Sequence, residues 1–111
     1  MKKPLISIIV TYYNKKKYIK KTINSLINQT YKNYQLIFVF DNQDKEDLFF
    51  IKKILKKIFK NKSIPPVIYG GSVDGTNIHK FRDLKVIDGF LIGGASKSSK
   101  KFIDIIKNYY R

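Results

Sequence analysis

Apolar runs and amphipathic segments alternate along the whole chain. Four short runs rich in β-branched and aromatic residues have the continuous apolar character of strands buried on both faces. After each run, apolar residues recur at helical spacing, with lysines on the opposite side. The predicted strands cover residues 5–10, 35–40, 66–69 and 89–92, and the predicted helices cover residues 15–29, 47–60, 76–84 and 98–110.

Each long predicted helix has one apolar face that we expect to turn inward. The short third helix is expected to be capped by Thr76. The inward residues are expected to be Ile19, Ile23, Leu26 and Ile27 in the first helix, Leu48, Ile51, Leu55 and Ile58 in the second, and Phe102, Ile105, Ile106 and Tyr109 in the last. Alternating strands and helices require parallel strands with crossovers. We therefore expect an α/β fold of four βα units, with one parallel sheet in a single layered domain.

The length of 111 residues fits one domain. It is well short of the roughly 250 residues of a complete (β/α)8 barrel. Any barrel-like feature must therefore belong to a fragment or to an assembly.

The formal net charge of +15 would suit a polyanion-binding protein, because clustered lysines gain affinity by releasing counterions. However, only Arg82 and Arg111 among the 23 basic residues are arginine, which favours a background bias of composition. Cysteine is absent, so thiolate metal sites are excluded. The N-terminal apolar run is short and predicts a strand. We therefore expect a cytoplasmic protein without a transmembrane span and without a cofactor.

Ligands of parallel sheets collect at the carboxyl ends of the strands. Here two ends are polar, Thr11–Asn14 and Asp41–Asp47, and two are rich in glycine, Tyr69–Gly75 and Gly93–Ser99. Adjacent glycines let backbone N–H groups approach an anion, and a helix N-terminus adds its dipole. The acidic stretch has a second interpretation, as the start and cap of a helix.

Residues 4–60, with "SIIVTYYNKKKYIKKTINSLINQTYKNYQLIFVFD", resemble the start of family 2 glycosyltransferases of the GT-A fold. The resemblance implies that Thr11, Tyr13, Asn14 and Asp41 bind the nucleotide of a sugar-nucleotide donor. The family usually has proline at Thr11 and a second acid beside Asp41. It also needs a later D-x-D turn for a divalent metal and an acidic base, and the acids after Asp47 form no D-x-D. A metal is therefore expected only in a complete enzyme.

Residues 64–107, with "VIYGGSV", "VIDGFLIGGAS" and "FIDIIK", resemble the C-terminal end of the triosephosphate isomerase family. The resemblance implies that Ser72, Gly93 and Gly94 hold a phosphate through backbone N–H groups, with Gly71 shaping the loop. The glutamate, histidine and lysine of that chemistry lie on earlier strands of the family's barrel. We expect no catalytic residue and no metal ligand in this chain.

Residues outside these motifs have ordinary structural interpretations. His79 lies on the short third helix, where a surface or half-buried position is expected. Tyr69 is expected to pack in the core. Glu46, the single glutamate, falls in the first half of the chain, outside any motif of the isomerase family.

The sequence thus predicts two joined segments: a Rossmann-like glycosyltransferase segment at 1–60, and at 61–111 a segment resembling a quarter of the isomerase barrel. The main hypothesis is a catalytically incomplete fusion that binds a nucleotide or a sugar phosphate. One alternative is triosephosphate isomerase, interconverting glyceraldehyde 3-phosphate and dihydroxyacetone phosphate, and another is a lysine-rich polyanion binder. The expected partner is a small phosphorylated ligand, with no specific nucleic acid. Exposed sheet edges favour a homodimer.

Overall fold

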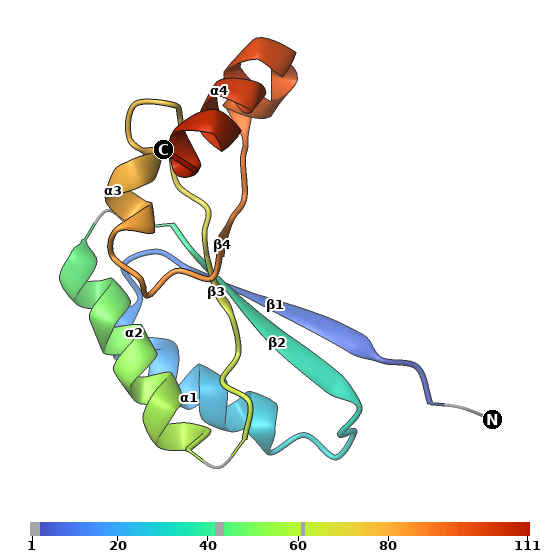
Figure 1. Cartoon of the computed structure of the whole chain (residues 1–111). Helices are drawn as coiled ribbons and strands as arrows, with labels where there is room; N and C mark the ends of the chain where they lie inside the picture. The colour runs from blue at the N-terminus through green and yellow to red at the C-terminus, as the bar shows by residue number, and fades with distance from the viewer. Residues whose placement is uncertain (1–2, 42–43, 61) are drawn as a thin grey trace.

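The computed structural model of the chain describes residues 3–41, 44–60 and 62–111. Four parallel strands form one sheet in the order β1–β2–β3–β4 and alternate with helices, so the predicted α/β class is confirmed (Figure 1). The strands are β1 (Ile6–Tyr12), β2 (Tyr34–Phe40), β3 (Val67–Tyr69) and β4 (Gly89–Phe90). The helices are α1 (Lys16–Ile27), α2 (Lys45–Ile58), α3 (Ile78–Arg82), the 3-10 turn η1 (Gly94–Lys97) and α4 (Ser99–Tyr109).

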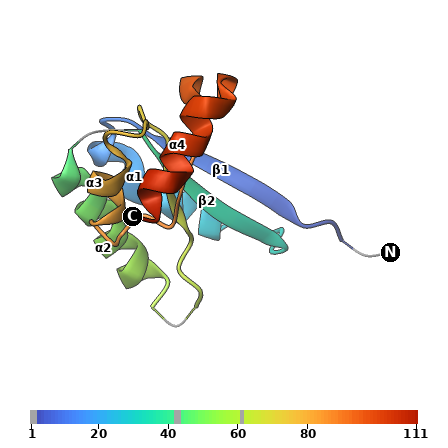
Figure 2. The same cartoon turned by 45° about the horizontal axis from the view of Figure 1, so that its top comes forward.

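The pleat of the strands divides the sheet into two unlike faces. Residues at every second position of β1 and β2 are buried or partly buried toward the helices, beginning with Ile8 and Leu36, and their neighbours face the opposite side. Helices α1 and α2 lie side by side on the buried face (Figure 1, Figure 2). The inward faces predicted for these two helices are confirmed, because Ile19, Ile23 and Ile51 are fully buried and the other predicted residues are at least partly buried.

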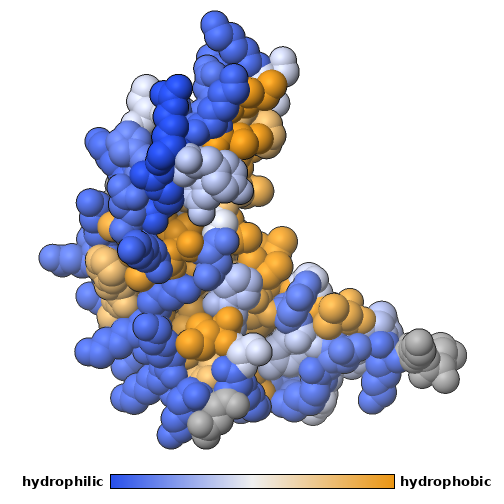
Figure 3. Space-filling view, viewed as in Figure 1, coloured by the Kyte–Doolittle hydropathy of each residue, from blue (hydrophilic) through white to orange (hydrophobic). Residues whose placement is uncertain are grey.

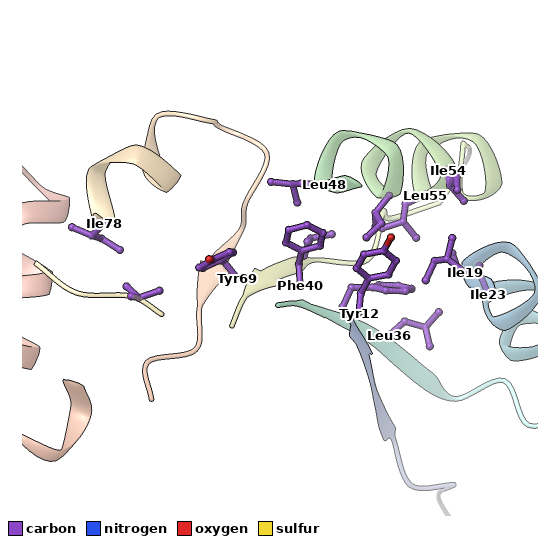
Figure 4. Close-up of a cluster of buried hydrophobic side chains, with 14 of the residues drawn as sticks. Tyr12, Ile19, Ile23, Leu36, Phe40, Leu48, Ile54, Leu55, Tyr69 and Ile78 are labelled. Atoms are coloured by element: carbon purple, nitrogen blue, oxygen red, sulfur yellow. The ribbon is translucent and has the colours of Figure 1, made fainter. Parts of the chain in front are cut away.

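Aromatic rings form a row across the buried face at the carboxyl ends of the strands (Figure 4). The register aligns Tyr12 with Phe40 and Phe40 with Tyr69. The rings of Tyr12 and Phe40 stack with centroids 5.5 Å apart, and Tyr69 stacks on Phe81 of α3 at 4.0 Å. Each such pair contributes about 0.5–1.5 kcal/mol beyond its buried area. The row thus joins both halves of the sheet to one core.

The hydroxyl of Tyr12 ends this row by donating to the Asp47 carboxylate at 2.8 Å. Burial raises the pKa of the Tyr12 hydroxyl, and the hydrogen bond and negative charge of Asp47 raise it further. Tyr12 therefore remains a neutral donor, and it fixes the start of α2 above the end of β1.

The closing helix departs from the sequence prediction. Ile105 is buried and Tyr109 is partly buried, as expected, but Phe102 and Ile106 are 38% and 44% exposed. The prediction that these two residues face inward is therefore wrong. The reason is topological: α4 follows β4, the last strand of the sheet, and within the described residues no further strand covers this side of the helix.

A charged contact crosses from the first half of the chain to the second. Lys52 of α2 donates to the Asp88 carboxylate at 2.9 Å, and the backbone N–H of Val67 donates to the same oxygen at 2.8 Å. Burial raises the pKa of the Asp88 carboxyl, but these two donors outweigh burial and leave its pKa below the ordinary value of 3.8. Asp88 thereby fastens the start of β3 to the loop before β4.

We predict that Asp88→Asn lowers the free energy of unfolding at pH 7 by about 1 kcal/mol, a figure reduced for the partial exposure of the pair. The pKa of Asp88 is lower in the folded chain than its ordinary value of 3.8. Its ionised form therefore stabilises the fold above pH 3.8, and this stabilisation is lost as the pH falls through the lowered pKa of the folded chain. Urea unfolding at pH 7 and pH 3 measures the difference.

Asp83→Asn is the matched control, because it removes the same charge from a carboxylate that pairs at the surface with its neighbour Arg82. We expect this variant to change the unfolding free energy by less than about 0.5 kcal/mol. Equal effects of the two substitutions, or a loss for Asp88→Asn that is the same at both pH values, would contradict the assignment.

Candidate functional site

A hollow of about 790 Å³ lies at the carboxyl ends of β3 and β4. It is formed by the loop after β3, the loop after β4, one face of α4 and the end of β2. Its lining consists of Asp41, Gly70, Gly71, Ser72, Val73, Asp74, Gly75, Thr76, Gly93, Gly94, Ala95, Lys101, Asp104 and Asn108. The two glycine-rich strand ends that the sequence singles out therefore meet in one site.

Hydrogen bonds that continue the sheet ladder align the loops around this hollow. The N–H of Asp41 donates to the carbonyl of Tyr12, and the N–H of Gly70 donates to the carbonyl of Phe40, each at 2.9 Å. The N–H of Leu91 donates to the carbonyl of Tyr69 at the same distance. The strand ends are thus level, and the loops that follow them open on the same side.

The loop after β3 is held by its own side chains. Oδ1 of Asp74 accepts from the Thr76 hydroxyl at 2.6 Å and from the backbone N–H groups of Thr76 and Asn77 at 2.8 and 3.0 Å. The Thr76 hydroxyl lowers the pKa of the Asp74 carboxyl, burial opposes this, and the two N–H groups add to the lowering. The prediction that Thr76 caps the third helix is wrong: Asn77 stands at the N-cap of α3, and the turn is organised by Asp74.

Two further contacts fix this loop in place. The Asn77 side-chain amide donates to the carbonyl of Ser72 at 2.8 Å, within the loop. The side-chain amide of Asn108, on α4, donates to the carbonyl of Gly75, also at 2.8 Å. The closing helix therefore supports the loop after β3, although it follows β4 in the chain.

Backbone donors of both loops are available to a ligand. Among the residues that the structure describes, no hydrogen bond uses the N–H groups of Gly71, Ser72, Gly93 or Gly94. Unpaired N–H groups gathered in a concave loop form an anion-binding arrangement. The chemistry available in this part of the hollow is therefore anion recognition through the main chain.

The glycines around the hollow fall into two groups, according to whether the structure has room for a side chain at their positions. A Cβ at Gly71 would lie 2.5 Å from the hydroxyl oxygen of Tyr69, and a Cβ at Gly70 would lie 2.6 Å from a methyl carbon of Val39. Packing therefore requires both of these glycines. A Cβ at Gly93 or Gly94 would meet nothing within 4 Å, so packing within the chain does not explain these two.

Tyr69 lies beneath the loop that contains Gly71. Its side chain is 1% exposed, as the sequence predicts for a packing residue, and its hydroxyl has no hydrogen-bond partner among the described residues. Burial raises the pKa of this hydroxyl, and the negative charge of Asp41 raises it further. The neutral ring of Tyr69 therefore packs directly against the loop at Gly71 and supports it from the core.

One face of α4 completes the hollow with residues that the sequence reasoning missed. Lys101, Asp104 and Asn108 follow one another at helical spacing and line the hollow together. In the sequence these three residues form a polar stripe along the last predicted helix. Such a stripe is indistinguishable from an ordinary solvent-exposed helix face until the position of the helix is known. With Asp41 and Asp74, three carboxylates and one ammonium group border the site.

The structure brings together five of the eight residues for which the sequence predicts a binding role. Asp41, Gly71, Ser72, Gly93 and Gly94 line the hollow. The others, Thr11, Tyr13 and Asn14, are exposed at the end of β1 and are not part of that lining. The predicted nucleotide group is therefore divided between two places.

The acidic stretch before α2 forms the start and the cap of the helix, which is one of its two expected roles. Asp44 is the N-cap, accepting from the N–H of Glu46 at 2.9 Å, and Glu46 and Asp47 occupy the first turn. Asp41 instead borders the hollow.

His79 is exposed, as expected. Of the residues described, no cluster of three His, Cys, Asp or Glu residues could hold a metal ion, and none of the described helices is long and apolar enough to cross a membrane.

Comparisons with known proteins relate most of the chain to one family. The model of the triosephosphate isomerase family matches residues 38–109. The isomerase of Debaryomyces hansenii is 52% identical over 42 residues, which are 38% of this chain and 16% of that protein. An uncharacterized glycosyltransferase of Haemophilus influenzae is 41% identical over 64 residues, which are 53% of this chain and 20% of that protein.

The fold as a whole is similar to a solved isomerase. The triosephosphate isomerase of Bartonella henselae matches with a TM-score of 0.61 over 96% of this chain and 50% of that one, at 22% identity. The chain thus spans half of that barrel, and it spans a fifth or less of the two curated relatives named above. Because the family model covers more than half of the sequence, the chain belongs to the triosephosphate isomerase family.

Proposed function

We propose that the chain binds the phosphate group of a triose phosphate in the hollow between the loops after β3 and β4. The observation that carries this proposal is the meeting of two glycine-rich loops in which the backbone N–H groups of Gly71, Ser72, Gly93 and Gly94 have no partner among the described residues. Ser72, Gly93 and Gly94 donate to the phosphate oxygens, and Gly71 shapes the first loop over Tyr69. Phosphate sites at the last two strand ends are typical of barrels of this class.

Electrostatics supports an anion here despite the carboxylates. The Asp74 carboxylate accepts three hydrogen bonds within its own turn, and these partly offset its negative charge. The ammonium group of Lys101 borders the hollow, and the whole chain carries a net charge of +15. A dianionic phosphate in the hollow therefore gains from the field of the protein, while Asp41 and Asp104 limit its affinity.

The residues around the hollow favour binding over catalysis. Interconversion of triose phosphates moves a proton between neighbouring carbons, with a base and groups that polarise the oxygens. Among the residues that the structure describes, the ionisable members of the lining are three aspartates and Lys101. Glu46 lies in the first turn of α2, and neither it nor His79 is in the lining of this hollow. We infer that the chain holds the phosphate without completing the isomerisation.

A sugar-nucleotide ligand is the second candidate, supported by the glycosyltransferase relative and by the position of Asp41 in the hollow. In this proposal residues 1–60 and 61–111 descend from different enzymes, the first being a family 2 glycosyltransferase. The resulting chain nevertheless has one core, because the ring contact of Phe40 with Tyr69 and the Lys52–Asp88 pair cross the boundary.

A titration with three ligands separates the candidates. We expect dihydroxyacetone phosphate to bind saturably with one site per chain, and UDP and a short DNA duplex to bind more weakly at physiological salt. Tighter binding of UDP would favour the sugar-nucleotide candidate. A dominant DNA affinity that falls steeply between 50 and 200 mM salt would favour the polyanion alternative. The absence of saturable triose phosphate binding would contradict the proposal.

Gly94→Ala should weaken triose phosphate binding by about tenfold or more, because the added methyl occupies the space through which the phosphate approaches the backbone. Stability should stay within about 1 kcal/mol of the parent, since no atom lies within 4 Å of that methyl. Gly89→Ala is the control, because its Cβ makes an ordinary contact at 3.8 Å outside the hollow. Calorimetric titration of the two variants should therefore differ; equal affinities would count against the phosphate site.

Lys101→Gln should weaken triose phosphate binding about threefold to tenfold, because it removes the ammonium group that borders the hollow. Lys100→Gln removes the same charge one residue away, outside the lining, and should change the affinity by less than about twofold. Calorimetry at constant ionic strength measures both. If the two variants lost affinity equally, binding would depend on overall charge and not on this hollow.

A further inference from the structure

The sheet ends in two unpaired edges. In the described strand order, β1 and β4 are the outermost strands, and each has one neighbour, β2 and β3 respectively. The outer side of each strand therefore presents backbone donors and acceptors to solvent. Exposed parallel edges of this kind are templates for pairing with another strand.

The open face of the sheet carries no charge within the described strands. Its residues occupy the strand positions between those of the aromatic row, and so point to the opposite side. A Cβ at Gly70 would contact both Val39 and Leu91, so these two side chains lie close together on this face. The face consists of Ser7, Ile9, Thr11, Gln35, Ile37, Val39, Ile68, Gly89 and Leu91. Ile9 and Leu91 are 62% and 57% exposed. In a chain with 28% charged residues, such a face is suited to burial.

Helix α4 carries further exposed apolar residues, next to the end of the sheet at β4. Phe102, Ile103 and Ile106 are all exposed on this helix. Phe102 and Ile106 line a groove of about 420 Å³, whose lining also includes Phe90, Ile92, Tyr110 and the carboxylate residue Asp88. Figure 3 shows apolar surface on the concave side, beside α4 and along the arm that contains β1. Exposed apolar residues therefore lie on the open face of the sheet and on the last helix, and together they are the surface that lacks a neighbour among the described residues.

We propose that a second copy of this chain covers this surface and that two copies close into an eight-stranded barrel. The described sheet has four parallel strands with helices on one face, and it matches half of a solved isomerase barrel. Closure of such a barrel requires eight βα units. A two-fold axis along the barrel places β4 of each copy beside β1 of the other, so all four free edges are paired.

The arrangement of charge favours this occupant over an acidic or basic partner. The open face is uncharged, so its complement is another uncharged face, which a second copy supplies. The lysines of α1 and α2, such as Lys20 and Lys56, are exposed on helices that would form the outside of the barrel. The lysines of one copy would repel those of the other only at long range, and added salt screens this repulsion. Dimerisation should therefore strengthen as salt is added.

Closure would also complete the phosphate hollow. In one chain, the hollow is bordered by the ends of β2, β3 and β4, and the end of β1 lies apart from it. In the closed dimer, the turn after β1 of the second copy, which includes Tyr13, lies beside the Gly93–Gly94 loop. The dimer itself does not depend on phosphate binding, so each proposal can fail while the other holds.

Sedimentation equilibrium of the full chain over a range of concentrations tests the dimer. We expect a monomer–dimer equilibrium that stops at two copies and that becomes tighter at 0.5 M salt than at 0.1 M. Ile9→Lys should raise the dimer dissociation constant by about tenfold or more, because each dimer would bury two such lysines. Leu91→Lys tests the other edge and should act in the same direction.

Phe49→Lys is the matched control, since Phe49 is 48% exposed on α2, on the helical side of the sheet. It should leave the dissociation constant within about twofold, and far-ultraviolet circular dichroism verifies that all three variants fold. A monomer at every concentration, or assembly that continues beyond two copies, would overturn the proposal. Equal weakening by Phe49→Lys and by both edge variants would overturn it as well.

Discussion

The structure depends on the row of aromatic rings that crosses the sheet at the carboxyl ends of its strands. Tyr12, Phe40 and Tyr69 are aligned by the strand register, and Tyr69 stacks on Phe81 of the short helix α3. These contacts set the level at which each strand ends. The loops of the candidate site begin one or two residues later, so their relative positions follow from the packing of these rings.

The candidate site uses the main chain more than side chains. Gly71, Ser72, Gly93 and Gly94, whose backbone N–H groups have no partner among the described residues, line a hollow whose bordering side chains are mostly neutral or acidic. Glycine serves two purposes there: Gly70 and Gly71 lack the room for a side chain, whereas Gly93 and Gly94 leave open space. If the hollow binds a phosphate as proposed, its selectivity would rest on shape and on the electrostatic field of the chain, because the proposed donors are backbone groups.

A one-sided sheet explains the other unusual features of the molecule. Helices cover one face, so the opposite face exposes Ile9 and Leu91, and within the described part of the chain both edge strands lack a second neighbour. The same incompleteness exposes Phe102 and Ile106 on α4, since the described sheet ends at β4. The exposed apolar residues therefore have a common cause in the topology. In a closed barrel the same positions would be interior or covered.

The sequence by itself determined the order of strands and helices, the inward faces of α1 and α2, and the two glycine-rich strand ends, because periodicity and glycine placement are local signals. The tertiary structure decided which strand ends meet. It brought Asp41 to the glycine loops, left Thr11 and Tyr13 apart, and added Lys101 and Asn108 from a helix stripe. It also exposed Phe102, because burial of a helix face depends on a neighbouring strand that local periodicity does not report.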